Sequence, residues 1–186
     1  MDALTALHKR VSVPRLGAPG PDAEQLEALL RAAMRAPDHG LLRPWRFVVL
    51  DGERRERFGE RLEAILLEDQ PDADDAAREK ARAHSLRAPM VIVAVAEIEP
   101  DHPKAPPVEQ IMATACAVEN MMVTAHALGL GAMWRTGGWA RDNRVKHALG
   151  FAAKDEIVSF LYLGQPAGNI KSVPEPVLTD YLRELP

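Results

Sequence analysis

The chain has a single cysteine, Cys116, among its 186 residues, so it cannot form an intramolecular disulfide. This is typical of a reducing compartment, and we expect a cytoplasmic protein. No apolar run approaches the roughly 20 residues of a membrane-spanning helix. The N-terminal MDALTALHKR lacks the apolar core of a secretory signal. The formal net charge of −4 gives no basic surface for nucleic acid or anionic lipid, so neither partner is expected.

The motifs of several common enzyme classes are also missing. No Gly-x-Gly-x-x-Gly follows a strand, no Walker A sequence occurs, and no Gly-x-Ser-x-Gly is present. The six histidines show no His-Glu-x-x-His spacing, and one cysteine cannot build a zinc site, so we expect no metal. Cys116 lies in the most apolar segment, which favours a buried hydrophobic side chain over a catalytic thiol.

Hydrophobic periodicity predicts an α+β chain of one domain, residues 1–186, with three α/β/α layers. The central sheet is expected to be mixed and to have about four strands. We expect helices over 2–9, 22–36, 53–69, 73–86, 108–128 and 141–149, and strands over 45–50, 90–96, 131–136 and 157–163.

The segment 108–128 is apolar almost all round, which is typical of a buried helix and allows one that is shared with a second subunit. The final 20 or so residues are rich in proline and lack helical periodicity. Such a tail is usually mobile unless it docks on another part of the protein or on a second subunit.

Three short stretches interrupt this simple pattern with basic and polar residues. Arg10–Arg15 places two guanidinium groups and a hydroxyl in six residues, which suits either a phosphate site or a solvated helix end. Pro37–Gly40 separates a helix from a strand and is either a turn or a site. Gly131–Gly138 carries Arg135 directly after a strand, where it could face a cleft or lie in a surface turn.

Together these stretches resemble the FMN-dependent nitroreductases, in particular their small YdjA-like branch. The resemblance covers nearly the whole chain through the order and spacing of its motifs. These motifs are Met1–Leu4, Arg10-x-Ser12, Arg31–His39, Pro44–Phe47, Arg87–Pro89, Trp134-Arg135 and Phe160–Gly164.

The resemblance implies a nitroreductase-like fold that binds FMN at the interface of a homodimer. In similar proteins the Arg-x-Ser segment and the loop after the third strand hold the flavin, and the partner subunit adds two residues. The residues that match are Arg10, Val11, Ser12, Trp134, Arg135 and Thr136 in one subunit, and Arg35 and His39 in its partner. The resemblance also implies that a swapped C-terminal segment wraps the other subunit and that 108–128 is the central helix of the dimer.

The activity implied is an oxidoreductase that uses NAD(P)H in a ping-pong scheme to reduce a small acceptor such as a nitroaromatic or a quinone. No side chain is assigned as a catalytic acid or base. The alternatives are a non-catalytic flavin carrier or regulatory protein of the same fold, and a thiol or hydrolytic enzyme that uses His39.

The sequence departs from this family at Val11, where many relatives have a second arginine, and at Arg43, where glutamine is common. Arg15 is displaced by one position from the usual basic residue. The cation that faces the reduced flavin is therefore open among Arg15, Arg35 and Arg43.

Overall fold

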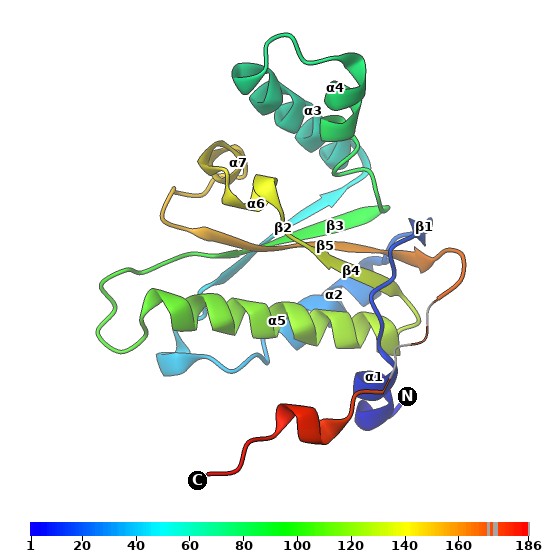
Figure 1. Ribbon diagram of the computed structural model, residues 1–186, viewed down its shortest axis with the longest axis vertical. Coiled ribbons are helices and arrows are strands. Elements are labelled where there is room, and N and C mark those ends of the chain that lie inside the picture. The colour runs from blue at the N-terminus through cyan, green and yellow to red at the C-terminus, as the bar shows by residue number, and fades with distance from the viewer. Residues whose placement is uncertain (171, 173–174, 186) are drawn as a thin grey trace.

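Five strands form one sheet that helices cover on both faces, in a computed structural model that describes residues 1–170, 172 and 175–185 (Figure 1). The strands are β1 (Leu16–Gly17), β2 (Trp45–Asp51), β3 (Met90–Ala96), β4 (Gly131–Arg135) and β5 (Glu156–Pro166). The four strands expected from the sequence are all present, and the α+β class and the three layers are confirmed. The short strand β1 was not expected.

The expectation of a mixed sheet is wrong, because every hydrogen-bonded pair of strands in the described part of the chain is antiparallel. Two helices separate β2 from β3, so the chain returns to the end at which β2 finished and β3 runs in the opposite direction. A single helix separates β3 from β4, which makes these two strands parallel to each other. They do not pair, however, because β5 lies between them.

One layer consists of α2 (Ala23–Ala33) and α5 (Pro107–Ala127), which lie together on the same face of the sheet (Figure 1). Asp22 begins α2 with a capping box, in which its side chain accepts from the Gln25 amide and the Gln25 side chain accepts from the Asp22 amide. The helix ends at Ala33, three residues before the expected end, because residues 34–36 form a turn ahead of Pro37.

The opposite layer consists of α3 (Gly52–Asp69), α4 (Asp75–Arg82), α6 (Gly138–Arg141) and α7 (Asn143–Ala148). It packs on the other face of the sheet around Leu62, Val93 and Phe160, each of which is fully buried. All seven residues of β3 are buried, as expected for a central strand covered on both faces.

The remaining elements are α1 (Ala3–Lys9), η1 (His39–Leu41) and η2 (Leu178–Tyr181). α1 and the C-terminal segment lie on the side of α5 that faces away from the sheet (Figure 1). The apolar side chains of Val177, Leu178, Tyr181 and Leu182 are exposed in the single chain. That this segment is swapped onto a partner stays a prediction. None of the described helices is long and apolar enough to cross a membrane.

Candidate cofactor site

The segment that carries Arg10, Val11 and Ser12 runs along the edge of β4. The Val13 amide donates to the Ala132 carbonyl at 2.9 Å, and the Val13 side chain is buried. This contact brings the Arg10–Arg15 and Gly131–Gly138 stretches together at one edge of the sheet. Trp134 lies only two residues after Ala132.

A cavity of about 610 Å³ opens beside this segment. Its walls come from the N-terminal region (Met1, His8, Lys9, Arg10, Val11, Val13), from the end of α5 and the start of β4 (Met122, His126, Gly129, Leu130, Ala132) and from the chain after β5 (Pro166, Ile170, Ser172). The basic side chains of Lys9 and Arg10 thus lie beside apolar residues such as Val13 and Leu130 in one lining. Ser12, Arg35, His39 and Trp134–Thr136 are not part of its lining.

Arg10 is held at one end of its guanidinium group and left open at the other. Its Nε lies 3.1 Å from Glu119 Oε1 on α5. Its Nη1 is buried and has no hydrogen-bond partner among the described residues. His126 Nε2, in the same lining, is likewise buried without a partner in the described part of the chain. Buried polar atoms are normally satisfied, so both nitrogens indicate a place for a further polar group.

Trp134 and Arg135 point to opposite faces of the sheet. The Trp134 ring packs towards α5, and its Nε1 donates to the Val158 carbonyl at 3.0 Å. The indole therefore packs against the core and is not free to contact a ligand. The backbone of Trp134 is the part of this residue that is left to contact one. Thr136, directly after β4, is exposed.

The Arg135 side chain faces the α3 layer, close to a pair formed by the half-buried His84 and the buried Tyr162. The Tyr162 hydroxyl donates to the His84 carbonyl at 2.9 Å and lies 3.2 Å from a ring nitrogen of His84. Burial, together with the positive charges of Arg87 and Arg135, lowers the pKa of His84 from 6.5 to about 4. Burial also raises the pKa of Tyr162, against the effect of the same two arginines. A neutral pair therefore lies next to two cations.

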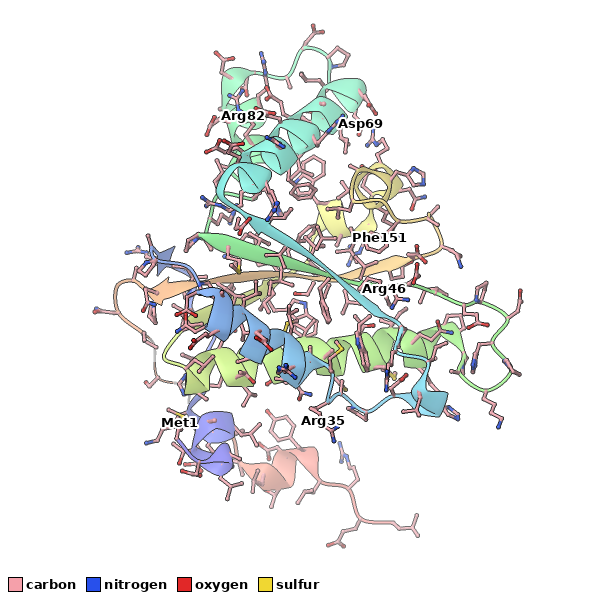
Figure 2. The ribbon with its side chains drawn as sticks, turned by 180° about the vertical axis from the view of Figure 1, so that it is seen from behind. Met1, Arg35, Arg46, Asp69, Arg82 and Phe151 are labelled. Carbon is pink, nitrogen blue, oxygen red and sulfur yellow. The ribbon has the colours of Figure 1, made fainter. Side chains whose placement is uncertain are left out.

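Arg35 and His39 lie elsewhere on the single chain. Arg35 lines a separate hollow with Glu119 and α1, on the side of the molecule away from α3 and α4 (Figure 2). His39 Nδ1 lies 2.8 Å from Glu109 Oε2, at the opposite end of α5 from the cavity. The ten residues from Glu109 to Glu119 span about 15 Å of helix at 1.5 Å per residue, so one chain does not bring His39 to Arg10.

The Pro37–Gly40 stretch is a turn, as one of the two interpretations held. Asp38 Oδ2 accepts from the Arg43 amide at 2.6 Å, and Gly40 has a φ of 70°. The carboxylate of Asp38 therefore serves the turn, while His39 projects from it half-exposed.

The other candidate cations lie at different places. Arg15 is exposed, and its side chain passes close to Gly168 after β5. Arg43 borders an apolar groove of about 750 Å³ between α2 and the unpaired edge of β2. Which cation faces a reduced flavin stays open.

Sequence reasoning missed Glu109 and Glu119, which contact His39 and Arg10. The available signal was that they are the only acidic residues of α5, an otherwise apolar helix. It also missed that Arg87 and Arg135 both lie close enough to His84 to lower its pKa, which depends on the tertiary packing of the turn before β3 and of β4. Among the described residues, no three His, Cys, Asp or Glu side chains lie together as metal ligands do.

Residues 7–165 match the model of the Nitroreductase family. The chain is 45% identical over 179 residues to the "Putative NAD(P)H nitroreductase YdjA" of Escherichia coli (strain K12), which covers 95% of this chain and 96% of that protein. A nitroreductase-like family protein from Bacillus cereus has the same fold, with a TM-score of 0.83, 21% identity and coverage of 100% of this chain and 96% of the other. A nitroreductase from Desulfovibrio desulfuricans, described as a complex with FMN, aligns with a TM-score of 0.75 and 25% identity over 100% and 98% of the two chains.

Proposed function

Since this chain belongs to the nitroreductase family, we propose that it is an FMN-dependent oxidoreductase that uses NAD(P)H to reduce a small electron acceptor. A nitroaromatic or a quinone is the proposed class of acceptor. The name of the Escherichia coli relative supports the nicotinamide donor, and the FMN complex of the Desulfovibrio protein supports the cofactor.

The observation that carries the proposal is the cavity beside Arg10. A ligand pocket of typical size, about 300–1,000 Å³, is mostly apolar and has a few placed polar groups. Here Val13, Leu130 and Ala132 form an apolar wall, and Lys9 and Arg10 lie beside it. The Nη1 atom of Arg10 is buried and has no hydrogen-bond partner among the described residues. Such a combination fits a phosphate on a carbon chain, and FMN presents both.

In this proposal Arg10 and Lys9 bind the phosphate, since a guanidinium pairs with phosphate through charge-assisted hydrogen bonds. Val11 and Ser12 lie next along the chain, and the end of β4 at Trp134–Thr136 extends the same edge towards the ring of the cofactor. When bound, FMN supplies the hydride chemistry, and nearby cations stabilise the negative charge that reduction adds. The donor and the acceptor are proposed to bind in turn at the same place.

We further propose that the active form is a homodimer. His39 contacts Glu109, which lies about 15 Å along α5 from the contact of Arg10 with Glu119 on the same chain, so a second copy has to supply His39 if it contacts the flavin. Met1 ahead of α1, Leu4 on α1, and Val108 and Met112 on α5 have exposed apolar side chains, which is consistent with a buried interface between copies.

The C-terminal segment of the second copy is the proposed occupant of the groove between α2 and β2. The groove is apolar and is bordered by Arg31, Arg43 and Arg46, while the tail combines exposed apolar residues with Asp180 and Glu184. Sedimentation of the full chain is expected to give a dimer, and removal of 175–186 is expected to weaken it. A full-length monomer at micromolar concentration would contradict this proposal.

Absorption spectra of the purified protein test the function. The protein mixed with FMN and freed of excess is expected to retain a flavin spectrum, which NADH or NADPH should bleach and a nitroaromatic or a quinone should restore. A protein that retains no flavin refutes the proposal. Retained flavin that neither donor bleaches supports the carrier alternative instead. The cytoplasmic location stays a prediction.

A further inference from the structure

Two carboxylates on α5 hold two of the side chains assigned to the cofactor. Glu119 Oε1 lies 3.1 Å from Arg10 Nε, and Glu109 Oε2 lies 2.8 Å from His39 Nδ1. We propose that Glu119 and Glu109 are positioning residues, which set the direction in which Arg10 and His39 face the flavin phosphate and ring. The proposal rests on the proposed function and adds to it two residues that would not touch the cofactor.

The contact at Nε fixes the orientation of the whole Arg10 guanidinium group, because this group is planar and rigid. With Nε turned to Glu119, Nη1 is left buried without a partner among the described residues, in a side chain that lines the cavity. A free arginine would lose rotamer entropy on binding a ligand, and an arginine that is already held loses less.

The charge of Glu119 acts in the opposite direction. A carboxylate close to an anion site repels the anion, so its removal would tighten FMN binding if charge alone mattered. The Glu119 side chain is 44% exposed, and solvent and salt screen such a charge strongly. Orientation of Arg10 is therefore the larger effect, and removal of Glu119 should weaken binding.

Glu109 determines which nitrogen of His39 faces outwards. When Nδ1 donates to a carboxylate, the ring proton resides on Nδ1 and Nε2 is presented to the other side. The His39 side chain is 50% exposed and stands in the η1 turn, where a second subunit can reach it. The same contact ties the turn to α5 across 70 residues of sequence.

Titration of flavin fluorescence against the full-length protein tests Glu119. We expect Glu119→Ala to weaken FMN about 3- to 10-fold, the effect of one hydrogen-bonded contact, and Glu119→Gln to weaken it less. Glu53→Ala is the matched control, since it breaks the exposed Arg57–Glu53 pair on α3 and should leave the affinity unchanged. An unchanged or tighter affinity for FMN in Glu119→Ala overturns the proposal.

A double-variant cycle separates positioning from a general structural effect. In an Arg10→Ala background, Glu119→Ala should cause no further loss of affinity, because its effect passes through Arg10. A further loss of the same size shows that Glu119 acts on the fold and not through Arg10, which also overturns the proposal.

Nitrogen chemical shifts of the imidazole rings test Glu109 without any flavin. At alkaline pH the apo protein should show His39, identified by its loss in His39→Asn, with the proton on Nδ1. Glu109→Ala should move that proton to Nε2, and an unchanged tautomer overturns the role of Glu109. If the wild-type protein binds no FMN, the proposed function fails, while this measurement still decides the orientation of His39.

Discussion

Acidification should destabilise the protein through His84. The ring of this residue packs edge-on against Phe160, with ring centroids 5.0 Å apart, and near the Tyr162 hydroxyl. Burial, reinforced by Arg87 and Arg135, lowers its pKa from 6.5 to about 4. Between these two values the unfolded chain binds a proton at this position that the folded chain does not bind, so stability is present above pH 6.5 and is lost as the pH falls.

The size of this effect follows from the two pKa values. Between about pH 7 and about pH 4.5, His84 should cost about 2 kcal/mol of the free energy of unfolding, since each unit corresponds to about 1.4 kcal/mol. Carboxylates also titrate as the pH approaches 4, so the pH dependence of the wild-type protein alone does not isolate His84.

The assay is therefore a comparison of urea unfolding at both pH values for the wild-type protein and for His84→Gln, at one protein concentration. The variant should be less stable at neutral pH, because it loses the ring that packs on Phe160. Its further loss on acidification should be smaller than that of the wild-type protein by about 2 kcal/mol. Equal losses in the two proteins would refute the reasoning.

Two further predictions concern the edge of the sheet that carries the site. Arg10→Ala and Arg135→Ala should each loosen FMN roughly 10- to 100-fold, the value of about 1.5–3 kcal/mol for a charge-assisted contact. Fluorescence titration measures this, and unchanged affinity in both variants argues against the assigned residues. Gly164→Ala should destabilise the fold by about 1–3 kcal/mol through overpacking. Its new Cβ would lie 2.7 Å from the carbonyl oxygen of Gly17 and from the ring of Pro89. Gly138→Ala meets no atom within 4 Å and should unfold in urea like the wild-type protein.

Family resemblance singled out Arg10–Ser12 and Trp134–Thr136 as cofactor residues, and of these Arg10 and Val11 line the cavity. The Arg10–Ser12 and Trp134–Thr136 segments do share one edge of the sheet, through the Val13 and Ala132 backbone contact. The opposite directions of Trp134 and Arg135 could also have been predicted, because successive side chains of a strand point to opposite faces. The contacts of Glu119 with Arg10 and of Glu109 with His39 could not, since they join residues 109 and 70 positions apart.

Local patterns along the chain are enough to predict the elements that depend on local chemistry. The capping box at Asp22, the apolar run of β3 and the turn at Asp38 each involve residues that are close along the chain, so each can be read from a short window. Three features follow from long-range packing instead: the strands pair antiparallel, β5 separates β3 from β4, and Arg10 Nη1 is buried without a partner among the described residues. These features depend on which distant segments pack together, and that choice minimises the free energy of the whole chain and not of any one window.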